Sequence, residues 1–134
     1  IYQGECDLAI INHYYFGKLK YSDIEEQRKW MSKVYLIFPN QNQGDRGVHV
    51  NISGGGVVKY SKNKELAIKL LEFLTEKKAQ KLYSEINFEF PVNPNVTPGK
   101  KLSSWEKFRE DNVDIAKIAE YSNEAQIIID KVGW

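Results

Sequence analysis

Cysteine is almost missing from this sequence, because Cys6 is the only one among 134 residues. A single thiol excludes an internal disulfide framework and a zinc site built from several cysteines. An excess of one charge is missing too: 19 basic and 18 acidic residues leave a formal net charge of +1. Without a basic half that could follow a phosphate backbone, nucleic acid is not expected as a partner. No apolar run approaches the roughly 18 residues of a membrane span, so none is expected.

The sequence does hold enough apolar material for a folded core. Apolar residues make up 42% of the chain and aromatic residues 13%, in a length that suits one compact domain. The chain begins at Ile1 and has entered an apolar run by Cys6. We therefore expect a fragment, or a chain whose upstream part was removed, with any signal sequence missing from it.

The spacing of apolar residues predicts short strands that alternate with helices. Apolar or alternating runs bounded by turn residues predict strands at 4–11, 34–38, 48–53 and 57–60. A period of 3.6 residues predicts helices at 22–33, 63–74, 75–86 and, with a break near 122–123, 113–132. Ser22 and Glu25 have the spacing of a capping box at the first of these. This alternation favours an α/β or α+β fold.

Two features resemble catalytic or nucleotide-binding sites at first sight. Cys6 together with His13 or His49 could form a thiol-nucleophile site. No local signature surrounds Cys6, however, and a free cysteine at the start of an apolar strand is more often buried and inert. The glycine triplet at 54–56 leads into a predicted strand, whereas a phosphate-binding loop opens a helix. Neither an enzyme nor a nucleotide-binding protein is favoured.

The pair Tyr14-Tyr15 is the most informative pattern in the chain. It follows the predicted strand 4–11 directly, and α/β sheets bind ligands outside the carboxyl ends of their strands. Asn12 and His13 add two polar groups just before the pair. Tyrosine has a pKa of about 10 and is a poor ligand for weakly acidic metals, but a trivalent hard cation displaces the proton and holds the phenolate. Ferric iron is the obvious biological candidate.

Residues 4–15, which read GECDLAIINHYY, resemble the segment that carries a tandem-tyrosine iron site in ferric-ion-binding proteins of bacterial iron ABC transporters. The resemblance continues in order along the chain, at 38–41, 46–54, 72–74, 80–83, 87–94 and 132–134. Because it is collinear over essentially the whole chain, it is far more specific than the tyrosine pair alone. It matches the carboxyl-terminal part of the family, whose full-length members are much longer.

The resemblance implies that Tyr14 and Tyr15 bind Fe³⁺ as adjacent phenolate ligands. Asn12 matches a position that in some members helps to hold a synergistic anion, such as carbonate or phosphate, beside the iron. The remaining ligands of the family lie upstream of the matching part, so this chain is expected to supply an incomplete site. The implied protein is a binding component without catalytic activity. It is periplasmic, or lipid-anchored outside the membrane, and it delivers iron to an inner-membrane ABC permease.

The resemblance also implies pieces of a type II periplasmic binding protein fold, an α/β fold with a mixed sheet flanked by helices. Residues 1–45 would belong to the carboxyl lobe and carry the tyrosine pair. Residues 46–99 would cross the hinge and pack on the amino lobe, and residues 100–134 would return to the carboxyl lobe. Because neither lobe would be complete, the isolated chain is expected to form a homodimer or a larger assembly.

One alternative stays open within the same fold. The chain could belong to a receptor for another ligand, such as a different metal, a polyamine or an organic anion. In that case the tyrosines would stack on the ligand or hydrogen-bond to it, and no visible colour would develop.

Overall fold

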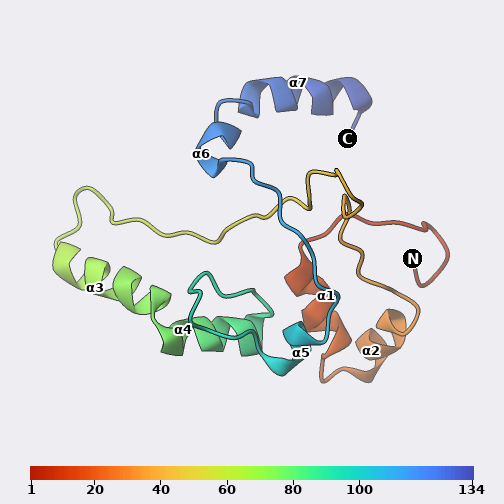
Figure 1. Ribbon diagram of the computed structural model, residues 1–134, viewed down its shortest axis with the longest axis horizontal. Helices are drawn as coiled ribbons and strands as arrows, with labels where there is room; N and C mark the ends of the chain where they lie inside the picture. The colour runs from red at the N-terminus through yellow and green to blue at the C-terminus, as the bar shows by residue number, and fades with distance from the viewer. The chain divides into compact units, whose positions relative to one another are not determined.

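The computed structural model describes all residues, 1–134, and its regular structure is helical (Figure 1). It contains seven α-helices and one π-helical turn. In chain order these are α1 (His13–Lys20), α2 (Glu25–Met31), α3 (Lys64–Thr75), α4 (Lys77–Leu82), η1 (Tyr83–Asn87), α5 (Lys100–Ser103), α6 (Ile115–Ile118) and α7 (Ser122–Val132). No helix is both long and apolar enough to cross a bilayer.

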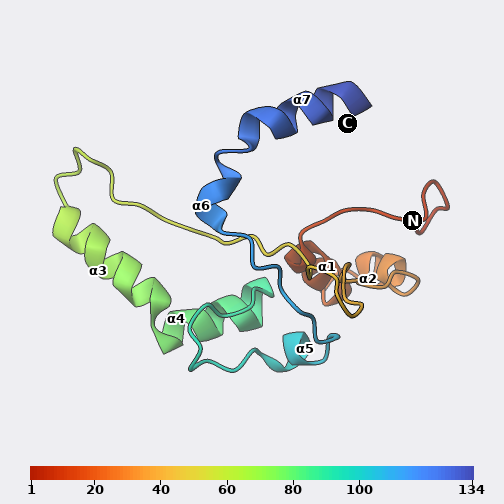
Figure 2. The same cartoon turned by 45° about the horizontal axis from the view of Figure 1, so that its top comes forward.

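Helix α3 lies where the apolar period predicts it, and α4 follows after a bend that Figure 2 shows. The chain leaves the helix at Glu76, whose extended backbone (ψ 158°) separates the two. The buried side chain of Gln80 fixes this join. Its Nε2 donates to the carbonyl of Leu74 at 2.7 Å, and its Oε1 accepts from the N–H of Val92 at 2.8 Å. One glutamine therefore holds the end of α3 and the segment after η1 to α4.

Two other helices are shorter than the sequence predicts. Helix α2 begins at Glu25 rather than beside Ser22, because the Ser22 hydroxyl accepts the N–H of Ile24 at 3.1 Å in a turn before the helix. The helix expected over 113–132 is divided into α6 and α7, and the interruption at 119–121 lies close to the break expected near 122–123. The helical character of both segments is confirmed.

The chain divides into two compact units, 1–37 with 53–107 and 38–52 with 108–134. In the first unit an aromatic cluster surrounds helix α1. Phe88 is buried and stacks on Tyr21, with ring centroids 5.4 Å apart, and on Trp105 at 6.4 Å. Phe16, on the buried side of α1, meets the edge of Trp105 at 5.7 Å. This cluster holds α1 to the segments that follow η1.

In the second unit, Arg109 holds a loop in shape. Its Nη2 donates to the carbonyls of Asn42 and Asp45 at 2.9 and 2.7 Å, and the carbonyl of Asn40 lies at 3.4 Å. A guanidinium carries several donors on a rigid fork, so one side chain can satisfy several carbonyls of a tight turn. Arg109 is more than 60 residues from this loop in sequence, so the contact joins distant parts of the chain.

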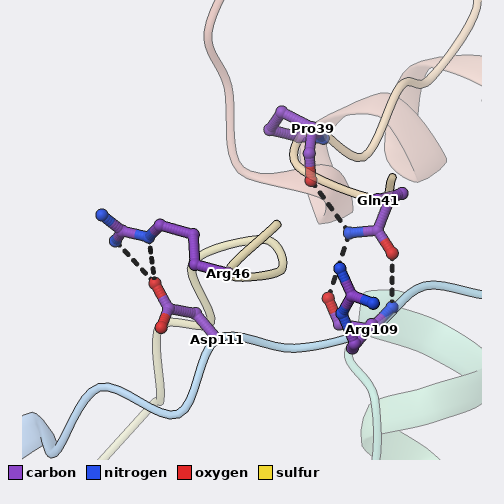
Figure 3. Close-up of polar contacts among 5 residues, drawn as sticks. All are labelled: Pro39, Gln41, Arg46, Arg109 and Asp111. Atoms are coloured by element: carbon purple, nitrogen blue, oxygen red, sulfur yellow. Dashed lines mark hydrogen bonds and ion pairs between the residues drawn. The ribbon is translucent and has the colours of Figure 1, made fainter. Parts of the chain in front are cut away.

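Gln41 completes the join between the loop and the segment that carries Arg109 (Figure 3). The Arg109 N–H donates to Gln41 Oε1 at 2.6 Å, and Gln41 Nε2 donates to the Arg109 carbonyl at 3.0 Å. Figure 3 also shows Arg46 paired with Asp111, at 2.5 Å between nitrogen and oxygen. An isolated parallel bridge pairs Val48 with Glu110, in which the Val48 N–H donates to the carbonyl of Arg109 and the Asp111 N–H donates to the carbonyl of Val48, each at 2.9 Å.

Loss of the Arg109 side chain should loosen this loop locally. In Arg109→Ala the N–H groups of Asp45 and Gly47, which bond to carbonyls across the loop, should exchange with deuterium at least about tenfold faster. Arg28→Ala is the matched control. Arg28 and the single carbonyl to which it donates, that of Ser22, both lie in the first unit and not in this loop. Equal exchange rates in wild type and Arg109→Ala would show that Arg109 does not hold the loop.

The predicted strands do not pair. The chain contains no β-ladder, and the bridge at Val48 is isolated. A strand is stable only when its backbone groups bond to a neighbour and one face is covered. The segments instead lie extended with apolar side chains in solvent: Leu8 and Ile10 are 80% and 84% exposed, and Ile37 is 68% exposed. The mixed sheet is therefore not formed within this chain and stays a prediction.

The expectation of a buried Cys6 is wrong in this structure. The thiol is exposed, and its Sγ lies 3.5 Å from the amino group of Ile1. The expectation assumed that residues 4–11 form a strand covered on both faces, and this segment is extended and uncovered here.

Candidate metal centre at the start of helix α1

Helix α1 begins at His13, so the tyrosine pair occupies its first turn. Asn12 is the N-cap residue, with an extended backbone (φ −71°, ψ 133°), and its side chain makes no capping hydrogen bond. The first turn contains no acidic side chain. The N–H groups at a helix start lack partners within the helix and carry partial positive charge, which favours anionic groups there. Negative oxygen ligands therefore meet a favourable field at this end of α1.

The two tyrosine rings approach each other. Their centroids are 4.3 Å apart and the ring planes are inclined at 43°. Successive residues of a helix point about 100° apart, so this approach comes from the rotamers of the side chains and not from the backbone alone. The pKa of Tyr15 is raised, first by the side-chain hydrogen bond with Tyr14, then by the charge of Tyr14 and by desolvation. The two phenol groups thus lie on neighbouring residues of one helical turn, with their rings in contact.

The tyrosines differ in their surroundings. Tyr14 is half-buried, whereas Tyr15 is 51% exposed. The ring of His13 lies edge-on to Tyr14, with centroids 6.3 Å apart. Lys18 lies on the same ring, with Nζ 5.3 Å from its centroid. The structure therefore constrains the side chain of Tyr14 more closely than that of Tyr15.

His13 belongs to the aromatic cluster rather than to the tyrosine pair. Its ring lies 5.2 Å from the Phe90 ring and 5.9 Å from the Trp105 ring, measured between centroids. Burial lowers the pKa of His13, and this outweighs a backbone hydrogen bond at Phe88 and the charge of Glu89, which both raise it. Its Nε2 is buried without a hydrogen-bond partner. The imidazole is thus a neutral packing element behind the turn that carries the tyrosine pair.

Nothing else in the chain gathers into a metal site of the usual kind. No three side chains of histidine, cysteine, aspartate or glutamate come together in an arrangement that could hold an ion. Tyr14 and Tyr15 thus offer two oxygen donors, and Asn12 an uncommitted amide beside them. A hard trivalent ion prefers about six donors, so further ligands must come from outside these residues.

One residue of this site was not anticipated from the sequence. Lys18 follows Tyr14 by four positions, the spacing that places two side chains on the same face of a helix. Lys20 has the same spacing from Phe16, with Nζ 5.1 Å from that ring centroid. Once the helix start at His13 is known, the spacing of four residues predicts that Lys18 lies beside the Tyr14 ring.

The family model described as "bacterial extracellular solute-binding protein" matches residues 13–110, which include the first turn of α1 and both segments of its aromatic cluster. The chain belongs to this family of bacterial extracellular solute-binding proteins. The match covers well over half of the chain, and it begins at the residue where helix α1 begins.

Members of the solute-binding family with curated names are similar over nearly the whole chain. Iron uptake protein A1 of Synechocystis is 38% identical over 131 residues, which are 98% of this chain and 36% of that protein. The major ferric iron-binding protein of Neisseria meningitidis serogroup B is 28% identical over 125 residues, 93% of this chain and 36% of that protein. The chain thus spans a little more than a third of the length of these relatives.

Solved structures from the solute-binding family show the same fold. The ferric binding protein from Campylobacter jejuni aligns with a TM-score of 0.90 and 38% identity, over 98% of this chain and 41% of that one. A Trichodesmium protein solved in complex with iron and citrate ligands aligns with a TM-score of 0.83 and 44% identity. The alignment covers 92% of this chain and 39% of the Trichodesmium chain. The fold of this chain is therefore that of part of a type II solute-binding protein.

Proposed function

We propose that this chain forms the carboxyl-terminal part of a receptor that captures Fe³⁺ outside the inner membrane and delivers it to an ABC permease. The observation that carries the proposal is the approach of Tyr14 and Tyr15 in the first turn of α1, with ring centroids 4.3 Å apart. Support comes from relatives named as iron uptake and ferric iron-binding proteins. The receptor binds and releases its cargo without transforming it, so it is not an enzyme.

The chemistry of the pair favours ferric iron over other ions. Phenolate is a hard, strongly basic oxygen donor, and Fe³⁺ is acidic enough to displace its proton near neutral pH. Mg²⁺ and Ca²⁺ favour carboxylates and carbonyls, and no such cluster accompanies the pair. Two adjacent phenolates therefore discriminate for the trivalent ion against the commoner divalent ones.

Asn12 is proposed to help hold an anion beside the iron. Its side chain is not used as a helix cap, it is exposed, and it lies two residues before Tyr14 at the positive end of α1. Carbonate or phosphate could bind there and fill coordination positions that the tyrosines leave open. The Trichodesmium relative, solved with iron and citrate, supports an anionic companion to the metal.

The division of the chain in the complete receptor is part of the proposal. Residues 1–45 belong to the carboxyl lobe, residues 46–99 cross the hinge and pack on the amino lobe, and residues 100–134 return to the carboxyl lobe. Extended segments such as 4–11, unpaired here, would join strands of a mixed sheet that the rest of the receptor completes. The receptor is periplasmic or lipid-anchored outside the membrane.

The direct test adds ferric citrate to the full-length receptor that carries these residues. We expect a visible absorption band from phenolate-to-iron charge transfer that saturates at one iron per receptor. Ferric citrate in buffer alone provides the blank, and Mg²⁺ and Ca²⁺ should produce no band. If no band develops, the pair does not bind iron, and a receptor for another metal, a polyamine or an organic anion becomes the better assignment.

The isolated chain is proposed to associate into dimers or larger assemblies. Only five apolar side chains are buried in 134 residues. On α3, Leu66 and Leu70 are 65% and 56% exposed, and on α7 Ile127 and Ile128 are each 54% exposed. Uncovered faces of this kind drive self-association.

Light scattering of the isolated chain at micromolar concentration tests this. We expect the mass of a dimer or more, reduced in Leu70→Glu, which places a charge on the apolar face of α3. Lys69→Glu is the control, because Lys69 is an exposed polar neighbour on the same helix. A well-folded monomer of the wild-type chain would disprove the proposal.

A further inference from the structure

Lys18 places a positive charge over the ring of Tyr14. Its Nζ lies 5.3 Å from the ring centroid, within the range of an effective cation–π contact. Lys18 is exposed and takes part in neither ion pair of the chain, Arg46–Asp111 or Lys81–Glu85. No acidic side chain lies in the first turn of α1. The charge over this ring is therefore not neutralised by a neighbouring carboxylate on the turn.

Tyr14 alone of the pair has such a contact. No lysine or arginine lies over the ring of Tyr15, whose ring contact is the tilted one with Tyr14. The contact follows from the i, i+4 spacing on α1, so it is held by the helix itself. The two phenols of the pair thus differ in their electrostatic surroundings.

We propose that Lys18 is a positioning residue that stabilises Tyr14 as a phenolate ligand and sets the energy of its charge-transfer band. This inference rests on the proposed function, because it concerns the iron-bound state of the same pair. A coordinated phenolate carries negative charge delocalised into its ring, so a cation over the ring face attracts it more strongly than a neutral phenol. Lys18 therefore favours the iron-bound form of Tyr14.

The same charge has a predictable effect on colour. Phenolate-to-iron charge transfer moves electron density from the ring to the metal and leaves the ring more positive in the excited state. A cation over the ring opposes that movement and shifts the band to shorter wavelength. Removal of the cation should shift the band to longer wavelength, by on the order of 5 to 10 nm for a charge at this distance in a partly exposed site.

The chain contains its own matched control. Lys20 lies over Phe16 with Nζ 5.1 Å from the ring centroid, at the same spacing on the same helix. Phe16 has no oxygen and is buried in the aromatic cluster, so it cannot bind the metal. Lys20→Met removes one positive charge from α1 without touching a ligand ring. A general effect of charge on α1 would appear in both variants, whereas the proposed effect appears only in Lys18→Met.

The experiment compares wild type, Lys18→Met, Lys18→Arg and Lys20→Met in the full-length receptor loaded from ferric citrate. The visible band and the affinity, from competition with excess citrate, are measured for each. We expect Lys18→Met to show the shift to longer wavelength and about two- to fivefold weaker iron binding. Lys18→Arg should restore both values, and Lys20→Met should match wild type.

The possible results separate the two proposals. A wild-type receptor without a visible band would refute the iron site, and the role of Lys18 with it. A wild-type band whose position and affinity do not change in Lys18→Met would refute the role of Lys18 alone. The same shift in Lys18→Met and Lys20→Met would also overturn it, because the effect would then come from net charge rather than from the ring contact.

Discussion

Tyr14→Phe and Tyr15→Phe are each expected to abolish the visible iron band of the full-length receptor. Phenylalanine keeps the ring and its packing but lacks the oxygen that binds the ion. The ring centroids of the pair lie 4.3 Å apart in the first turn of α1, so we expect both oxygens to bind the same ion. With a single phenolate left, the site should no longer hold Fe³⁺ against citrate in solution, and charge transfer from either ring should disappear.

The measurement is a visible titration of each variant with ferric citrate, beside one of Tyr60→Phe. Tyr60 is 83% exposed and lies far from the pair in sequence, so the loss of its hydroxyl should leave the band intact. Circular dichroism shows whether each variant retains its fold. Wild-type spectra in both Tyr14→Phe and Tyr15→Phe would count decisively against the assignment of the pair as iron ligands.

The helices of this chain could be predicted from its sequence because their signals are local. Leu66, Leu70 and Phe73 recur at helical spacing, and α3 is found at Lys64–Thr75 as expected. Boundaries were less accurate where a side chain competed with the helix. The Ser22 hydroxyl bonds to the N–H of Ile24, so the predicted capping box forms a turn instead, and α2 starts at Glu25.

The strands could not be decided in the same way, because pairing depends on partners distant in the chain or outside it. Residues 4–11 have the composition of a buried strand, yet Leu8 and Ile10 are more than three-quarters exposed. A sequence pattern indicates which side chains favour burial, but it does not identify the segment that packs against them. The burial expected for Cys6 was wrong for the same reason, since it depended on neighbours that the described residues do not provide.

The candidate site was found from residue type and order, but its geometry was not. Tyr14 and Tyr15 were singled out by their chemistry, whereas helical spacing alone predicts rings that diverge. Their approach depends on side-chain rotamers and on the packing behind them, where His13 faces Phe90 and Trp105. Lys18 needed only the helix start to be known, because its spacing from Tyr14 then fixes the shared face.

Gly17→Val is expected to lower the free energy of unfolding by about 1 to 2 kcal/mol and to weaken iron binding. Gly17 is buried in α1, and a Cβ at this position would lie only 2.5 Å from Cγ of Phe88. Phe88 cannot move away easily. Its ring is stacked on Tyr21 and Trp105, and its backbone has a positive φ of 60° at the end of η1.

The higher helix propensity of valine should raise the free energy of unfolding of Gly17→Val, but by less than the steric clash lowers it. Glycine within a helix is less favourable than alanine by about 1 kcal/mol, so replacement would stabilise an unobstructed helix. Overpacking a buried site costs about 1 to 3 kcal/mol, and valine presents two methyl groups to the Phe88 ring. The steric effect should therefore exceed the gain in propensity. Displacement of α1 also moves the turn that carries Tyr14 and Tyr15.

Denaturant unfolding of the full-length receptor, with and without iron, measures both effects. Gly56→Val is the matched control, because a Cβ there would meet nothing within 4 Å and its φ is not positive. We expect Gly17→Val to lose stability and part of the visible band, and Gly56→Val to retain both. If Gly17→Val unfolds at the same denaturant concentration as Gly56→Val, the contact between α1 and Phe88 does not support the ligand-bearing turn. The site would then depend on another contact of the aromatic cluster, of which Phe16 against Trp105 is the next to test.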